Sequence, residues 1–80
     1  MIHIDLTFYA QLREQAGSSE TRFSTTAKTV ADLYQELKQV HGFTLDEAVM
    51  KAAVNDAFCD WGQPLRDGDS VTFVPPVAGG

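Results

Sequence analysis

The clearest pattern along the chain is an alternation of apolar and polar residues at its beginning. Over residues 2–9, apolar residues hold every second position, and polar residues or tyrosine stand between them. A period of two places successive side chains on opposite faces, so this segment is predicted to be a strand with one apolar face. Residues 70–74 alternate in the same way around Val71 and Phe73. Pro75 ends this last strand, because proline has no N–H for the ladder.

One longer segment has the spacing of a helix. Apolar residues recur at intervals of three and four between residues 30 and 41, which predicts a helix with one face in the core. Thr29 and Asp32 resemble a capping box, and Gly42 is a candidate for the left-handed residue after the helix. The side chains expected on the inward stripe are Val30, Leu33, Leu37 and Val40, with Tyr34 beside them.

Shorter segments complete the predicted fold. In chain order they begin with a helical turn at residues 10–16 closed by Gly17, a strand at 20–24, and irregular residues 43–49, of which 45–49 are a candidate helical turn. Strands at 50–54 and 57–61 joined by an Asn55-Asp56 turn follow, and then a turn at 66–69. The first two strands are expected to form a hairpin. Since one long helix can cover only one face of a sheet, this order predicts an α+β layer pair.

Composition and charge exclude several classes of partner. The 80 residues carry 6 Lys and Arg against 11 Asp and Glu, a formal charge of −5, which argues against nucleic acid and anionic membranes. The chain begins with a strand pattern and contains no apolar stretch long enough to span a bilayer, so we expect a cytoplasmic protein. The single cysteine, Cys59, is expected to be a small core residue, and His3 and His41 have no metal-ligand spacing with it.

The last six residues have the clearest chemical meaning. Pro75-Pro76-Val77-Ala78 leads into Gly79-Gly80, and proline favours an extended approach while glycine fits a narrow slot. Fully extended, this segment reaches roughly 20 Å. The sequence therefore predicts a domain at residues 1–74 and an extended tail at 75–80. The reactive group of that tail is its C-terminal carboxylate, although an idle terminus has the same composition.

Five segments of the chain resemble a known family, and they align with it in the same order. They are Phe8–Glu14, Ala52–Asn55, Pro64–Asp69, Val71–Phe73 and Pro75–Gly80. Together they resemble the small subunit of molybdopterin synthase, the MoaD family, over essentially the whole chain. The resemblance implies a β-grasp, or ubiquitin-like, fold. In that fold the first and last strands lie side by side at the centre of a mixed sheet, and one main helix packs on one face.

The resemblance also implies that the chain functions as a sulfur carrier and contributes no catalytic side chain. Gly80 would be adenylated by a MoeB-like enzyme that uses ATP and magnesium, so that this chain binds no cofactor. A sulfur-donating system would then convert the adenylate to a thiocarboxylate. The tail would enter a MoaE-like large subunit, within a heterotetramer, and give its sulfur to a cyclic pyranopterin precursor to build the molybdopterin dithiolene.

Matching positions suggest where the large subunit docks. Tyr9 and Val74 fall out of phase with the core residues of their strands, so both are expected on the sheet face without the helix. In the family, the positions of Tyr9, Phe58 and Val74 contribute to this contact. Arg13 could pair with an acid on a partner or remain solvated.

Two other functions stay open. One is a different Gly-Gly carrier, either of the thiamine pathway or a ubiquitin-like protein that is conjugated to lysines. The other is an interaction module whose tail is inert. The Pro-Pro-Val-Ala lead-in resembles the molybdopterin type more than the other carriers.

Overall fold

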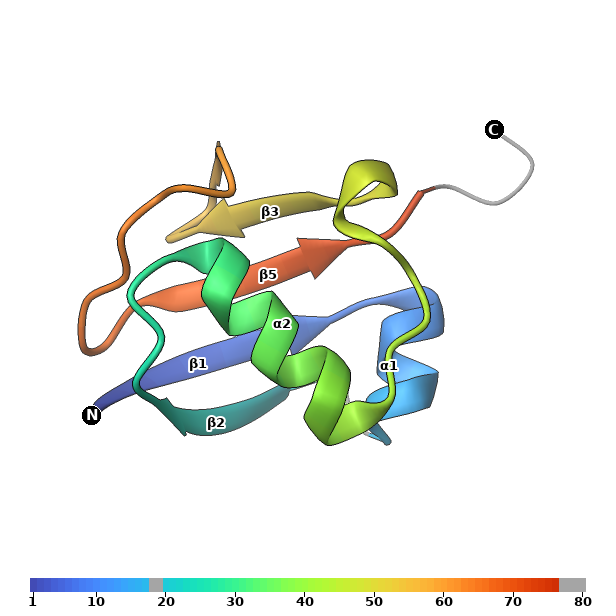
Figure 1. Ribbon diagram of the computed structural model, residues 1–80, viewed down its shortest axis with the longest axis horizontal. Coiled ribbons are helices and arrows are strands. Elements are labelled where there is room, and N and C mark those ends of the chain that lie inside the picture. The colour runs from blue at the N-terminus through green and yellow to red at the C-terminus, as the bar shows by residue number, and fades with distance from the viewer. Residues whose placement is uncertain (18–19, 77–80) are drawn as a thin grey trace.

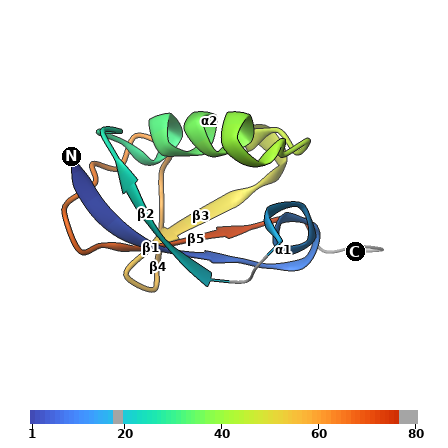
Figure 2. The same ribbon diagram turned by 90° about the horizontal axis from the view of Figure 1, so that it is seen from below.

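The described part of the chain is a single sheet with a helix across one face. The computed structural model describes residues 1–17 and 20–76, which form a five-stranded sheet in the order β2-β1-β5-β3-β4. Figure 1 shows helix α2 lying over the sheet. Figure 2 shows that the opposite face carries no helix in the part of the chain that is described. This is the predicted α+β arrangement of a mixed sheet and one main helix.

The pairing of the strands confirms the order expected from sequence and resemblance. β1 (Ile2–Phe8) and β5 (Ser70–Val74) run parallel as neighbours inside the sheet. β2 (Glu20–Thr25) forms the predicted antiparallel hairpin with β1. β3 (Lys51–Val54) pairs with β5, and the short β4 (Ala57–Cys59) pairs with β3. β4 ends two residues earlier than predicted, because the chain turns there through a bond from Gln63 N–H to the Asp60 carbonyl at 3.0 Å.

The helices begin and end where the local sequence requires. α2 (Val30–His41) has the predicted bounds, and the Thr29 hydroxyl accepts the Asp32 N–H at 3.3 Å as an N-cap. α1 (Ala10–Ala16) confirms the predicted turn, and a short 3₁₀ helix, η1 (Glu47–Val49), lies within the segment expected to be irregular. Gly17 and Gly42 follow α1 and α2 at φ values of 84° and 70°, the left-handed caps that glycine adopts without a steric cost.

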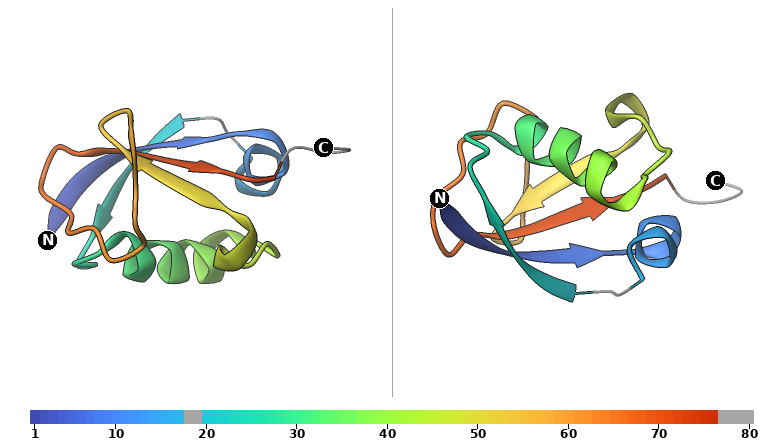
Figure 3. Two further views of the ribbon diagram at one scale, coloured as in Figure 1. Left: turned by 90° about the horizontal axis from the view of Figure 1, so that it is seen from above. Right: turned by 60° about the horizontal axis from the view of Figure 1, so that its bottom comes forward.

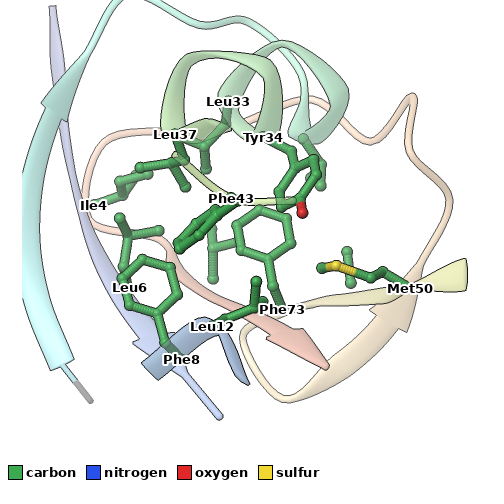
Figure 4. Packing of buried hydrophobic residues seen from close by; sticks show 13 residues of the cluster. Ile4, Leu6, Phe8, Leu12, Leu33, Tyr34, Leu37, Phe43, Met50 and Phe73 are labelled. Atoms are coloured by element: carbon green, nitrogen blue, oxygen red, sulfur yellow. The ribbon is translucent and has the colours of Figure 1, made fainter. Parts of the chain in front are cut away.

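The core fills the space between the sheet and α2. Figure 4 shows side chains of both layers meeting there. Alternate residues of β1 and β5 face α2, and Tyr34 packs between Phe43 and Phe73, with ring centroids 6.0 and 5.1 Å away. The fully enclosed residues at the centre are Ile4, Leu6, Phe8, Leu12, Val30, Leu33, Tyr34, Leu37, Val71 and Phe73.

The prediction that Val40 lies on the inward stripe of α2 is wrong. Its side chain is 58% exposed. In the last turn of α2, the inward position belongs to His41, whose ring lies 5.7 Å from that of Phe8 and 5.3 Å from that of Phe43. Val40 precedes it by one residue, about 100° around the helix, and therefore points away from the sheet.

Candidate functional site at the ends of β1 and β5

The parallel pairing of β1 and β5 places two predicted docking residues together. Thr7 pairs with Thr72 and Phe8 with Phe73, so Tyr9 and Val74 come next on adjacent strands. α1 lies beside this end of the sheet (Figure 3). Tyr9 is 51% exposed and Val74 is half-buried. As expected from their phase, both point away from the core.

Tyr9 and Val74 line a groove of about 770 Å³ between α1 and the end of β5. Pro75, Pro76 and Glu14 line it as well. Pro75 is buried and Pro76 is exposed, so the base of the predicted tail is packed into the body for one residue beyond β5. Val77, Ala78, Gly79 and Gly80 lie outside the described residues, and their predicted roles stay predictions.

A sharp reversal after β1 builds the second wall of this groove. Tyr9 is extended, with φ −122° and ψ 154°, whereas Ala10 is left-handed, with φ 50°. Helix α1 can therefore start directly after the strand, at a backbone cost of about 1 kcal/mol for a residue with a Cβ. Gln11 and Gln15 of α1 then donate from their side-chain amides to the Thr44 hydroxyl at 3.3 and 3.0 Å. These bonds hold α1 against the segment that follows α2.

The third docking candidate, Phe58, lies on the same surface as Tyr9 and Val74. Lys51, for which the sequence predicted no role, connects it to them. Phe58 is 71% exposed and lies opposite Ala53, on the sheet face away from α2. Lys51 lies opposite Val74 on that face, and its Nζ is 5.8 Å from the centroid of the Phe58 ring. A continuous row of side chains therefore crosses this face from the end of β1 over β5 and β3 to β4. It consists of Tyr9, Val74, Lys51 and Phe58, and we call it the docking row.

Arg13 does not belong to this surface. Its side chain is exposed on α1, and it neither lines the groove nor forms an ion pair with another described residue. Of the two roles considered from the sequence, solvation fits the free chain. A contact with a partner's acid stays a prediction.

The side chains that could do chemistry elsewhere have structural roles. Within residues 1–17 and 20–76, no group of three His, Cys, Asp or Glu side chains could hold a metal ion. The Asp67 carboxylate accepts the His3 backbone N–H at 2.7 Å, which lowers the pKa of Asp67. Asp69 accepts from the Arg66 N–H at 2.8 Å and from the Asn55 side-chain amide at 3.0 Å. Both aspartates thus have structural roles at the predicted turn of residues 66–69.

Cys59 is a packing residue, as expected. It lies against the core cluster and its thiol donates to the Ala52 carbonyl at 3.7 Å. Burial raises the pKa of this thiol, and the neighbouring Asp60 carboxylate raises it further. The thiol is therefore protonated at neutral pH, and a protonated thiol is a weak nucleophile.

Comparison with known proteins adds to this geometry. The model of the ThiS family matches residues 6–80. The chain is 36% identical to the molybdopterin synthase sulfur carrier subunit of Escherichia coli, over 96% of this chain and 99% of that protein. None of the described helices is both long and apolar enough to cross a membrane.

Two solved structures extend the comparison. SAMP1 from Haloferax volcanii, a small archaeal modifier protein, has a TM-score of 0.78 and 25% identity over 98% of this chain and 99% of that one. A complex of subunits 1 and 2 of molybdopterin-converting factor from Helicobacter pylori includes a chain with a TM-score of 0.69 and 25% identity, over 99% of this chain and 100% of that one.

Proposed function

The chain belongs to the ThiS family, and we propose that it is the sulfur carrier subunit of a molybdopterin synthase. The observation that carries this proposal is the 36% identity to the Escherichia coli sulfur carrier subunit over nearly the whole of both chains. The β-grasp fold implied by the family resemblance is confirmed by the similarity to solved structures.

The proposed reacting group is the carboxylate of Gly80. A carboxylate is a poor electrophile because it is already anionic, and adenylation neutralises it and supplies a leaving group. We assign ATP and magnesium to a MoeB-like activating enzyme, since this sequence has no glycine-rich phosphate-binding loop of its own. Sulfur from a donor system would then attack the acyl carbon, AMP would leave, and the thiocarboxylate would form. The thiocarboxylate would give its sulfur to the pyranopterin precursor, and hydrolysis of the acyl group would return the Gly80 carboxylate.

The structure of the body suits a carrier whose chemistry lies in its tail. Residues 75–80 follow β5, an inner strand that is hydrogen-bonded on both sides, to β1 and β3. Pro75 is buried at the end of β5, so the point where the tail begins is fixed relative to the docking row. A rigid base reduces the conformational freedom that must be lost when the tail enters a partner, which favours binding.

We propose a MoaE-like large subunit as the partner that receives the tail. The chain resembles one member of the Helicobacter pylori complex of subunits 1 and 2. The docking row lies on the sheet face that no described helix covers, and it includes Val74, which directly precedes the tail (Figure 2). Partner contact with this face would carry the tail towards the large subunit's active site. A heterotetramer of two small and two large subunits, formed in the cytoplasm, completes the proposal.

Reconstitution tests the proposed function. The chain would be incubated with a MoeB-like enzyme, ATP, magnesium and a sulfur donor, and then with the large subunit and the cyclic precursor. We expect mass spectrometry to find one oxygen replaced by sulfur in the C-terminal peptide, and then molybdopterin as product. Peptide mapping is required, because oxidation of Met1 or Met50 gives the same nominal mass change. Thiocarboxylate formation without product would contradict the molybdopterin assignment.

A protein modifier is the second candidate, and the similarity to SAMP1 favours it. The same activation would precede conjugation, so activation alone does not separate the two functions. Incubation of the activated chain with a cell extract of its source organism separates them. Covalent products on lysine side chains, without molybdopterin formation in the reconstituted system, would support the modifier. An unchanged C-terminal peptide in both experiments would support an inert tail.

A further inference from the structure

Lys51 occupies an unexpected position for a charged residue. It lies in the docking row between two apolar residues, opposite Val74 in the register and with its Nζ 5.8 Å from the ring centroid of Phe58. The surrounding positions on the same face are Ala53 and Thr72, which carry no charge. Lys51 is thus the one charged residue of the docking row, and Asp60 lies beside the row, directly after the end of β4.

This cation has no anionic partner in the described part of the chain. The ion pair found there joins Arg22 to Asp5, and the His3 Nδ1 lies 3.6 Å from the Asp67 carboxylate. Both contacts involve the first half of β1, away from the end where Tyr9 and Val74 lie. Asp60, which directly follows the end of β4 and lines the same hollow as Lys51, forms no ion pair with it. Among residues 1–17 and 20–76, the Lys51 ammonium thus forms no ion pair, and it lies over the ring of Phe58.

A partner that covers the docking row must also cover this charge. Phe58 and Val74 lie on either side of Lys51, so a surface that excludes water from both removes water from the ammonium as well. An ammonium that loses water without gaining an anion weakens binding strongly, whereas one that meets a carboxylate gains a charge-assisted bond. A large subunit that presents a carboxylate there should bind this face more tightly than one that leaves the ammonium without an anion.

We propose that Lys51 determines partner specificity, and that the large subunit accepting this chain places an aspartate or glutamate against it. The inference rests on the proposed docking function. It goes further by specifying a negative charge on the partner's surface and by naming Lys51 as the residue that recognises this charge. Large subunits with a neutral or basic residue at that place bind this chain poorly, even where their apolar contacts match.

Equilibrium binding of the large subunit from the same source organism tests the proposal, using calorimetry at fixed salt. We expect Lys51→Glu to weaken binding roughly 30-fold or more, the size of effect found when a buried charge pair is broken. Lys51→Arg keeps the charge and the contact with the ring, and we expect it to bind within about threefold of the wild type. A loss of less than tenfold for Lys51→Glu would overturn the proposal, because exposed ion pairs at an interface rim have effects of that size.

Lys28→Glu is the matched control. It makes the same change in net charge but lies in the loop between β2 and α2, at the other end of the sheet from the docking row (Figure 1). We expect it to bind like the wild type. If it weakens binding as much as Lys51→Glu does, the effect is one of net charge and the proposal fails. Circular dichroism of each variant checks that the fold is kept, which is expected because both lysines are exposed.

The outcome also separates this proposal from the one on which it rests. If neither the wild type nor Lys28→Glu binds the large subunit, the proposed function fails and the role of Lys51 fails with it. If both bind and Lys51→Glu binds equally well, the function stands and only the role of Lys51 is lost. A partner aspartate or glutamate exchanged for lysine should restore binding to Lys51→Glu, and failure of every such exchange at the contact would count against the assigned pair.

Discussion

At the scale of single residues, the turn between β3 and β4 offers a direct test of backbone strain. Asn55 and Asp56 have φ values of 52° and 69°, the pair of left-handed conformations that a two-residue hairpin turn requires. The side chain of Asn55 is bonded to Asp69 and Ser70, whereas Asp56 is exposed. We expect Asp56→Gly to raise the free energy of unfolding by about 0.5 kcal/mol, because relief of the left-handed backbone exceeds the added entropy of the unfolded chain.

The matched control for this substitution is Asp56→Ala. It removes the same charge but keeps a Cβ, so it isolates the backbone conformation from electrostatics. We expect it to lower the free energy of unfolding by about 0.5 to 1 kcal/mol. Thermal denaturation of the two variants should therefore move the midpoint in opposite directions, by a few degrees for a domain of this size. Equal midpoints would show that this turn carries no strain that glycine can relieve.

At the scale of elements, Tyr34 connects α2 to the segment that leads into β3. Its hydroxyl donates to the Leu45 carbonyl at 2.7 Å, and its ring is fully buried. Burial raises the pKa of Tyr34 to about 12, with further contributions from the charges of Glu47 and Asp46. Between pH 10 and 12 the unfolded chain loses this proton while the folded chain keeps it. The free energy of unfolding should therefore fall as the pH rises through this window.

Tyr34→Phe separates the hydrogen bond from the titration. At neutral pH we expect it to lower the free energy of unfolding by about 1 kcal/mol, the typical cost of a hydrogen bond removed from a carbonyl acceptor. Above pH 10 its stability should fall less steeply than that of the wild type. Urea denaturation at several pH values measures both effects. A slope for Tyr34→Phe equal to that of the wild type would contradict the assignment.

The elements also show what the sequence could and could not predict. The bounds of α2 were predictable because Thr29 and Gly42 terminate it by local chemistry, and β1 because alternation is a local property. Val40 was assigned to the core wrongly, because spacing alone does not tell which residue of the last turn meets a ring such as Phe8. The place of Lys51 depends on the register between β3 and β5, which no local pattern specifies.

At the scale of the whole molecule, the proposed function separates the body from the tail. The core lies between α2 and the sheet, whereas residues 79 and 80 lie beyond Pro76, the last described residue. We expect deletion of Gly80 to abolish activation by the adenylating enzyme, because the activated carboxylate would then belong to another residue in a shorter tail. The thermal midpoint and binding to the large subunit should stay close to wild type.

Gly79→Trp completes this test by keeping the length of the chain and changing only the width of the tail. A narrow slot that accepts glycine excludes an indole ring, so we expect sulfur transfer to fall by a factor of about 100 or more while docking through the docking row changes little. Binding by calorimetry and product formation in the reconstituted system measure the two quantities separately. If Gly79→Trp transfers sulfur at the wild-type rate, the tail does not enter a narrow slot. If deletion of Gly80 leaves product formation unchanged, the carboxylate of Gly80 does not carry the sulfur.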